Sequence, residues 1–400
     1  MRKLTYDELI LLNNLIYLQL NAKENEKLID IVERLLNNES FDNIDNCSIR
    51  MPKKEWVNIL VQIKNKSNLK NLRIRDIDNF KELIRFACFV DEKNNATAVF
   101  RGTVTIKEWE DNGQGAYEYD TKEQIDALNY INSLEFNDIT ITGHSKGGNK
   151  AQYVTILSSK INKCISVNGQ GFSNEFINKY KDEIQKNKSK IVCINSKYDY
   201  VYCLFNSISE NYHYIETEIQ INPLDYHKLN ILLDEDGNLR EETSEGAISR
   251  IINHFSISII SDLPKDIRIL IVNAIIDVIE LILCGGENEN NIIKDVGKLL
   301  IMVCHENCFK YKEIFNIAYA ILQAIIVPFI FWGELIIAEK SQSRELLSKV
   351  INKINVLENG IIKKMQIIDK DSINIINSIS KAVIVLTSEL ENEILISKIN

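Results

Sequence analysis

The sequence predicts an α/β fold, in which a mostly parallel sheet is flanked by helices, followed by a C-terminal all-helical domain. Short apolar runs rich in β-branched residues alternate with amphipathic runs of helical period over residues 1–244. At residues 138–149 one such strand runs into a Gly-x-Ser-x-Gly turn and then a helix. Beyond residue 245 apolar helical patterns follow one another. We therefore expect two domains, residues 1–244 and residues 245–400.

The composition indicates a soluble globular protein that does not bind nucleic acid. The 400 residues are 45% hydrophobic and 26% charged, and the formal net charge is −9. The eight Cys are scattered and several lie in apolar strand-like runs, which favours buried, reduced thiols in a cytoplasmic protein. The basic N-terminus is followed by acidic and amide residues that interrupt the apolar run, so we expect no signal peptide. Export by a route without such a signal stays open.

The first part of the chain is predicted to be helical. Apolar residues at three- and four-residue steps run through residues 4–36, and a second amphipathic run surrounds Trp56. Residues 37–47 are polar and Asn-rich and are expected to form a loop. Residues 64–70 are expected to form a solvated turn.

A pair of strands and a helix follow. Residues 86–90 and 96–100 are apolar runs, and residues 91–95 between them supply turn residues. Residues 121–134 place apolar side chains on one helical face, with Thr121 as the capping residue.

The Gly-x-Ser-x-Gly pattern at residues 143–147 is the centre of the predicted site. Ile139 and Ile141 alternate with threonines in the strand before it. Ser145 would occupy a sharp, strained turn, where only small neighbours let strand and helix approach. The helix behind it, at about residues 150–159, would direct its amide groups toward negative charge on a substrate.

Further strands are predicted after this turn. Residues 164–172 form a strand that ends in a Gly-rich loop, residues 173–187 a charged helix, residues 190–195 the next strand and residues 212–219 another. Loops at the carboxyl ends of parallel strands line the ligand crevice of open α/β sheets. The glycine spacing fits neither the dinucleotide fingerprint nor the P-loop, and we expect no cofactor.

Two sequence motifs carry a resemblance to a known family. Residues 100–103 read Phe-Arg-Gly-Thr at a strand end, about forty residues before Gly-His-Ser-Lys-Gly-Gly-Asn at residues 143–149. This pair resembles the class 3 (fungal-type) lipases, and still more a bacterial lipase-like branch, the Mbeg-like domain of unknown function. The resemblance spans about residues 4–239 and implies an α/β-hydrolase-like sheet. Residues 108–112 also resemble the family and are expected to form a loop beside the site.

The resemblance implies where an oxyanion would be bound. In the family the residue after the Gly of this strand end contributes a donor, and that position is Thr103 here. The second donor would be the amide of Lys146, the residue after the nucleophile. Many lipases carry a smaller or apolar residue at this second position. The Lys146 side chain would therefore either favour an anionic head group or simply be exposed.

A serine nucleophile needs a base, and the base needs an acid that orients it. In an α/β-hydrolase the chain order is Ser, acid, His. Asp199 directly follows the strand at residues 190–195, and class 3 lipases likewise carry an Asp before an apolar residue and a Val at this point. The alternative for Asp199 is a solvated loop carboxylate. Asp225 is a poor candidate for the acid because it lies only two residues before His227, the best candidate for the base.

The chain has five His from which to choose the base. His144 lies inside the Gly-x-Ser-x-Gly turn and is expected to support its structure. His213 belongs to an alternating strand pattern, and His254 and His305 belong to the C-terminal helical region. His227 follows in a loop-like stretch, and the family places its base in such a position.

These residues predict a serine hydrolase that cleaves carboxylic esters through an acyl-enzyme, with lipid or phospholipid acyl esters as the expected substrates. Ser145 is the expected nucleophile, His227 the base and Asp199 the orienting acid. The competing interpretation is a catalytically weak hydrolase fold that acts as a membrane-acting or protein-binding module, as in a toxin-like effector.

Residues 245–400 lie outside the resemblance. Residues 314–338 are long and apolar enough for a membrane span, but polar residues interrupt them, which favours a buried core helix over membrane association. Cys304 and Cys308 lack a second pair of ligands, so we expect no metal site there. A substrate cap, a module for peripheral membrane contact and an oligomerisation bundle all remain open for this region.

Overall fold

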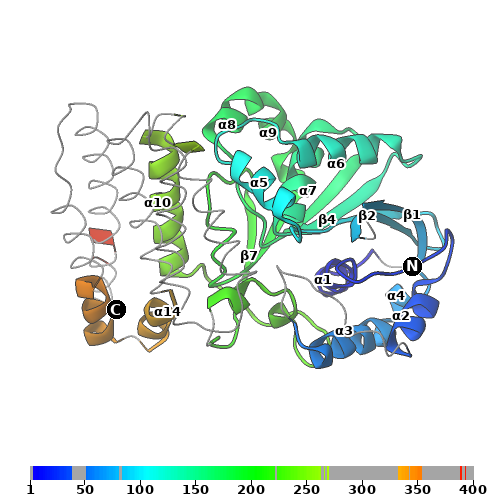
Figure 1. Ribbon diagram of the computed structural model, residues 1–400, viewed down its shortest axis with the longest axis horizontal. Coiled ribbons are helices and arrows are strands. Elements are labelled where there is room, and N and C mark those ends of the chain that lie inside the picture. The colour runs from blue at the N-terminus through cyan, green and yellow to red at the C-terminus, as the bar shows by residue number, and fades with distance from the viewer. Residues whose placement is uncertain are drawn as a thin grey trace, which may run out of the picture.

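The computed structural model describes residues 3–37, 51–80, 83–220, 223–262, 265, 268–269, 332–341, 343–353, 388–389 and 392. At its centre lies one eight-stranded sheet, in which the strands are neighbours in the order of the sequence (Figure 1). The strands are β1 (Arg73–Phe80), β2 (Leu83–Val90), β3 (Ala96–Phe100), β4 (Ile139–His144), β5 (Ile161–Val167), β6 (Ile191–Ser196), β7 (Asn211–Ile215) and β8 (Glu242–Thr243).

The sheet is parallel in its middle and antiparallel at its edges. Strands β3 to β7 pair in parallel, whereas the pairs β1–β2, β2–β3 and β7–β8 are antiparallel. Ala96 pairs with Ile139 and Phe100 with Gly143, so β3 and β4 end at the same edge. The predicted α/β domain with a mostly parallel sheet is therefore confirmed, with the qualification that the sheet is mixed.

The helices that connect the parallel strands lie on one face of the sheet (Figure 1). Since strand order follows chain order, every crossover advances in the same direction, and right-handed crossovers then place their helices on the same face. They pack on side chains such as Phe100, Ile141 and Cys164. The helices are α5 (Ile106–Gln114), α6 (Lys122–Ser133), α7 (Lys146–Leu157), α8 (Asn174–Lys179) and α9 (Lys181–Asn187).

The N-terminal helices cover the opposite face (Figure 1). Because strand side chains alternate between faces, Val99, Ile165 and Ile194 point to this side and pack with them. Every residue of α1 from Glu8 to Leu15 is buried, so this helix is an integral part of the domain core. The helices are α1 (Tyr6–Leu15), α2 (Leu28–Leu36), α3 (Lys53–Asn65) and α4 (Ser67–Lys70).

Several predicted boundaries were wrong. The helical pattern over residues 4–36 forms two helices, and the segment between them contains Asn21 and Asn25 at φ of 46° and 63°. Asn tolerates this left-handed backbone, which a helix cannot contain. Residues 64–70, expected as a turn, include the end of α3 and all of α4, and the helix expected at residues 173–187 is divided into α8 and α9.

Two further differences lie near the site. Residues 108–112, expected as a loop, belong to α5, which a capping box between Thr105 and Glu108 begins. The elbow helix α7 begins at Lys146, four residues earlier than expected. Its two glycines are poor helix formers, but a Cβ atom would overlap the Phe100 carbonyl at Gly147 and the Ser166 hydroxyl at Gly148. Strand β1 was not predicted, because its sequence is largely polar.

The described part of the C-terminal region includes α10 (Ala247–Asp262) and α14 (Trp332–Lys340). In the part of the chain that the structure describes, no helix has the length and apolar character of a membrane span. Most of the expected loop at residues 37–47, most of the apolar segment 314–338, and Cys304 with Cys308 lie outside the described residues. The domain boundary at residue 245 stays a prediction.

Candidate active site

Ser145 occupies a strained turn between β4 and α7. Its φ is 58° and its ψ is −124°, a backbone conformation that costs a non-Gly residue on the order of 1–3 kcal/mol and persists only where the surroundings impose it. A Cβ atom on Gly143 would overlap the backbone of Gly147 and lie 2.9 Å from the amide nitrogen of Gly148. A Cβ on Gly147 would lie 2.8 Å from the Phe100 carbonyl carbon. The predicted strand, turn and helix are thus confirmed. Both glycines are needed because a side chain at either position would overlap neighbouring backbone.

Asn149, the last residue of the motif, fixes the Gly-rich loop beside this turn. Its Nδ2 donates to the carbonyls of Gln170 and Gly171, at 3.2 and 3.1 Å. Its Oδ1 accepts from Nε2 of Gln124 on α6, at 2.8 Å. One buried amide therefore joins the elbow helix, α6 and the loop after β5.

The strand end of β3 lies next to Ser145. A Cβ on Gly102 would be 3.1 Å from Cβ of Ser145 and 2.8 Å from the His144 carbonyl, so Thr103 follows at a point adjacent to the nucleophile. Thr103 is buried, and its Oγ1 accepts a hydrogen bond of 2.7 Å from Nδ2 of Asn112. This arrangement agrees with the family position of the oxyanion donor, whose role here stays a prediction.

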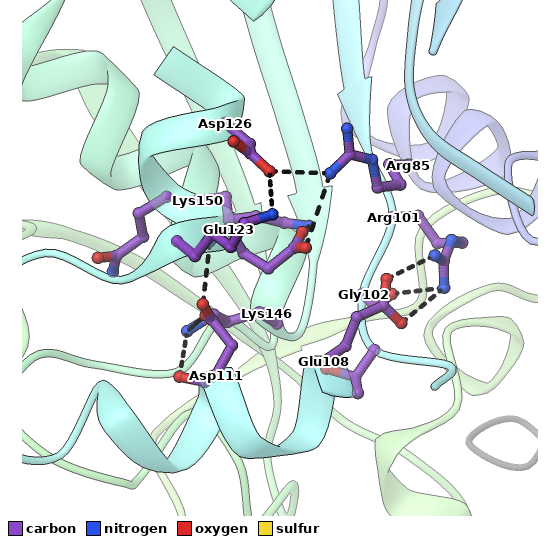
Figure 2. A network of polar contacts seen from close by, with 12 residues as sticks. Arg85, Arg101, Gly102, Glu108, Asp111, Glu123, Asp126, Lys146 and Lys150 are labelled. Atoms are coloured by element: carbon purple, nitrogen blue, oxygen red, sulfur yellow. Dashed lines mark hydrogen bonds and ion pairs between the residues drawn. The ribbon is translucent and has the colours of Figure 1, made fainter. Parts of the chain in front are cut away.

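A buried ion pair shapes the backbone of this strand end. The Arg101 guanidinium pairs with Glu108 at 2.7 Å, and both side chains are more than nine-tenths buried (Figure 2). Oε2 of Glu108 also accepts from the amides of Val104 and Thr105, both at 2.8 Å. Burial raises the pKa of Glu108, but Arg101, Lys150 and these amides together hold the pKa below its usual value. Glu108 therefore remains a carboxylate that holds the loop after Gly102.

The Lys146 side chain is neither exposed nor positioned as a free cation. Its Nζ lies 2.8 Å from Oδ1 of Asp111 and donates to the Asp111 carbonyl at 3.2 Å, and only 2% of the side chain is exposed (Figure 2). Asp111 also accepts from Oγ1 of Thr121 at 2.7 Å and from the amide of Glu123 at 2.9 Å. Burial raises the pKa of Asp111, but Lys146 and these donors outweigh it, so the pKa lies below its usual value. The expectation that the Lys146 side chain is exposed was therefore wrong, and a preference for an anionic head group stays a prediction.

Asp199 and His227 form a hydrogen-bonded pair. Asp199 follows β6 and is fully buried, and its Oδ2 lies 2.5 Å from Nδ1 of His227. Its Oδ1 accepts from the amides of Val201 and Tyr202, at 2.6 and 3.1 Å. A carboxylate at Nδ1 requires the hydrogen on that nitrogen, which leaves Nε2 of His227 able to accept a proton. His227 ends the short 3₁₀ helix η3 (Pro223–His227).

His144 joins this pair to the elbow. Nε2 of His144 lies 3.0 Å from the carbonyl oxygen of His227, and the two ring centroids are 4.5 Å apart. Among the described residues no hydrogen bond joins the His227 ring to Oγ of Ser145. Catalytic hydrogen bonds are often long without substrate and tighten in the complex. The structure thus joins Asp199 directly to His227, and joins the backbone of His227 to His144, the residue before Ser145.

The other candidates that the structure describes have partners of their own. His213 is on β7 and contacts Glu242, with Nδ1 2.9 Å from Oε1. Asp225 pairs with Lys228 at 3.0 Å. His254 on α10 is exposed and lies 3.3 Å from a carboxylate oxygen of Glu389, and His305 lies outside the described residues.

The structure adds residues that the sequence did not indicate. Nδ2 of Asn253 on α10 donates to the carbonyls of Cys203 and Phe205, at 3.0 and 2.9 Å. Phe205 has a φ of 69°, so this contact holds a strained part of the loop after β6, which contains Asp199. Oγ of Ser249 donates to the Lys197 carbonyl of the same loop at 3.0 Å. No local pattern signals these contacts, because each side chain is an ordinary polar residue of an amphipathic helix.

The described thiols and carboxylates do not form a metal site. Within the described segments, no group of three or more His, Cys, Asp or Glu could hold a metal ion. Cys88, Cys164, Cys193 and Cys203 are buried free thiols. Burial raises the pKa of Cys88 and of Cys193 to about 12, which makes them poor nucleophiles near neutral pH.

Comparison with known protein families finds a match for a large part of the chain. A family model described as Mbeg1-like matches residues 64–277 of the 400, which is more than half of the chain. No curated protein and no solved structure matches the chain significantly.

Proposed function

The chain belongs to the Mbeg1-like family, a lipase-like α/β-hydrolase family of unknown function, and from this premise we propose that it is a serine hydrolase acting on carboxylic esters. One observation carries the proposal. The Asp199–His227 pair is joined through His144 to the strained turn at Ser145, and strained backbone of this kind clusters at functional sites.

In the proposed reaction the hydroxyl oxygen of Ser145 attacks the ester carbonyl carbon while Nε2 of His227 accepts its proton. The amides of Thr103 and Lys146 stabilise the tetrahedral oxyanion, helped by the N-terminus of α7. When the bond to the leaving oxygen breaks, His227 returns its proton to that oxygen and an acyl-enzyme remains. Water then loses a proton to His227 and attacks the acyl carbon. As the bond to Oγ of Ser145 breaks, His227 returns the proton to that oxygen, which releases the acid and restores the Ser145 hydroxyl.

Lipid or phospholipid acyl esters are the substrate class that we propose. The apolar helical patterns of residues 245–400 would suit a long acyl chain or peripheral contact with a membrane surface. A panel of short and long p-nitrophenyl esters and phospholipids tests the chain-length preference, and co-sedimentation of the full chain with liposomes tests the membrane contact.

Labelling with a fluorophosphonate probe tests the enzyme itself. We expect the wild-type chain to be labelled and to hydrolyse esters, and Ser145→Ala to lose labelling and to lower kcat on the order of 10⁴- to 10⁶-fold. Two matched pairs test the partners. His227→Ala and Asp199→Asn should be strongly impaired, whereas His213→Ala and Asp225→Asn should stay within about twofold of wild type.

Two results would contradict the proposal. One is a Ser145→Ala variant that hydrolyses esters at the wild-type rate. The other is a folded wild-type chain that takes up no probe and cleaves no ester, which would favour the competing interpretation of a non-catalytic binding module.

A further inference from the structure

The hydroxyl group of Tyr17 lies where three parts of the proposed site meet. Tyr17 follows α1, outside the residues that the family model matches, and is 4% exposed. Its Oη lies 2.7 Å from Nδ1 of His144, which is 127 positions away in the sequence. The same oxygen accepts a hydrogen bond of 3.1 Å from the amide of Gly102. His144 in turn reaches the carbonyl oxygen of His227 at 3.0 Å.

The chemistry of the partners assigns every hydrogen in this chain of contacts. A carbonyl oxygen only accepts, so Nε2 of His144 carries the hydrogen that it donates to His227. In the neutral ring Nδ1 is then an acceptor, and the Tyr17 hydroxyl donates to it. The Tyr17 oxygen retains a lone pair for the Gly102 amide. The order of donation is therefore Gly102 to Tyr17, Tyr17 to His144, and His144 to His227.

Burial keeps the two side chains in this series of hydrogen bonds, Tyr17 and His144, neutral. Burial is the main cause that lowers the pKa of His144 well below 6.5, and the neighbouring His227 lowers it further. Burial likewise raises the pKa of Tyr17 above its usual value, although Arg101 and the Gly102 amide oppose it. Neither group changes its charge near neutral pH, so the hydrogen-bond order is the same throughout that range.

We propose that Tyr17 and His144 are positioning residues that hold the oxyanion strand end and the base loop in register with Ser145. The inference rests on the proposed function. Gly102 precedes the proposed oxyanion donor Thr103, His144 precedes the nucleophile, and the carbonyl that His144 holds belongs to the base itself. Without the Tyr17 hydroxyl the His144 ring can take the other tautomer, and its unprotonated Nε2 would then face the His227 carbonyl and repel it.

The kinetic test compares two substitutions that each remove one buried tyrosine hydroxyl. Tyr17→Phe should lower kcat for a p-nitrophenyl ester about 10- to 100-fold, as expected when catalytic groups shift by about 1 Å, with KM changed less than about threefold. The rate of fluorophosphonate labelling should fall in parallel. Tyr153→Phe is the control, because Tyr153 lies further along α7 and its hydroxyl donates at 2.8 Å to Asp120, which is not part of the proposed site. It should lose stability alone, with kcat within about twofold of wild type.

A second pair of variants covers the case in which Tyr17→Phe does not fold. In His144→Gln an amide nitrogen can still donate to the His227 carbonyl and an amide oxygen can still accept from Tyr17, whereas His144→Leu can do neither. We expect the Gln variant to retain at least tenfold more kcat than the Leu variant. Folded Tyr17→Phe with wild-type kcat and labelling rate, or equal activity of the two His144 variants, would overturn the inference.

An NMR measurement separates failure of the inference from failure of the proposed function. In protein labelled with ¹⁵N-histidine, His144 should show a protonated Nε2 and an unprotonated Nδ1, and Tyr17→Phe should disturb this state. If wild type neither hydrolyses esters nor takes up the probe, the proposed function fails, and the tautomer of His144 still decides whether the hydrogen-bond order is right. A protonated Nδ1 in an active wild-type enzyme would refute the inference alone.

Discussion

Two buried lysines on the elbow helix α7 should respond very differently to the same substitution. Lys146 and Lys150 are one turn apart, and each is 2% exposed (Figure 2). Lys146 pairs at 2.8 Å with Asp111, which is 6% exposed, whereas Lys150 lies 3.3 Å from Glu123, which is 13% exposed. Methionine has a similar length and no charge, so Lys146→Met and Lys150→Met remove the cation and largely preserve the packing.

The surroundings of the two carboxylates set the expected magnitudes. Breaking a buried ion pair leaves an uncompensated charge and costs about 3–5 kcal/mol. Asp111 keeps its donors Thr121 and the Glu123 amide, so we expect the lower end, about 3 kcal/mol, for Lys146→Met. In a domain of roughly 150–250 residues this corresponds to a decrease in Tm of roughly 6–12 °C.

Lys150→Met should cost much less. Burial lowers the pKa of Lys150, although Glu123 and Glu108 raise it, so the site already disfavours the charged form. Glu123 is partly exposed and also lies 3.7 Å from Arg85, so it keeps both water and a cation. We expect a loss of less than about 1 kcal/mol, the range of exposed pairs.

Thermal and urea unfolding at several pH values test this reasoning. The pKa of Asp111 is lower in the wild-type fold than in the unfolded chain, where it is near 3.8. Ionised Asp111 therefore stabilises the fold above pH 3.8, and this contribution is lost as the pH falls through the pKa of the folded state. In Lys146→Met the burial of Asp111 is no longer opposed by Lys146, and protonation relieves the unpaired charge. The stability difference between wild type and Lys146→Met should therefore narrow as pH falls from 7 toward 4.

A double variant completes the assay. Adding Asp111→Asn to Lys146→Met removes the unpaired charge and should recover about 1–2 kcal/mol. The reasoning is refuted if Lys146→Met costs no more than Lys150→Met, if the difference from wild type does not depend on pH, or if the double variant is less stable than the single one.

Three further predictions follow from the site. Gly102→Ala should lower kcat by more than tenfold and destabilise the fold by about 1–3 kcal/mol, because the new methyl group would overlap the Tyr17 hydroxyl. Kinetics and unfolding of the variant measure the two effects, and wild-type values in both would contradict the close approach of Tyr17 to Gly102. Asn253→Ala should lower kcat and cost about 1–3 kcal/mol by freeing two carbonyls of the acid loop; kinetics and unfolding of the variant measure both, and wild-type values in both would contradict this role of Asn253. Because the pKa of His144 is lowered in the fold, the unfolded chain binds more protons than the folded chain below pH 6.5. His144 should therefore lower the free energy of unfolding of the wild type by up to about 1.4 kcal/mol for each pH unit of acidification. Unfolding of His144→Gln at pH 5–7 should show a weaker dependence on pH, and an equal dependence would contradict a buried, neutral His144.

The local parts of the fold could be predicted because their signals are local. Short apolar runs on either side of turn residues indicated β2 and β3, helical spacing and a capping Thr121 indicated α6, and the Gly-x-Ser-x-Gly pattern indicated the turn at Ser145. These patterns report backbone preference and burial over a few residues, which act before any distant segment is in place. The family resemblance rests on the same kind of short, contiguous motif.

The tertiary structure decided which polar groups meet. Tyr17 and His144 are separated by 127 positions, and Lys146 and Asp111 by 35, so no period or spacing links them. The sequence shows that Lys146 carries a charge, but only the packing of α5 against α7 shows that the charge is buried and paired. A buried polar group must find a partner in whatever segment the fold brings beside it, because leaving it unpaired costs about 1–3 kcal/mol or more. The sequence by itself therefore determined the elements and the central turn, and the arrangement of those elements in space determined how the candidate site is held.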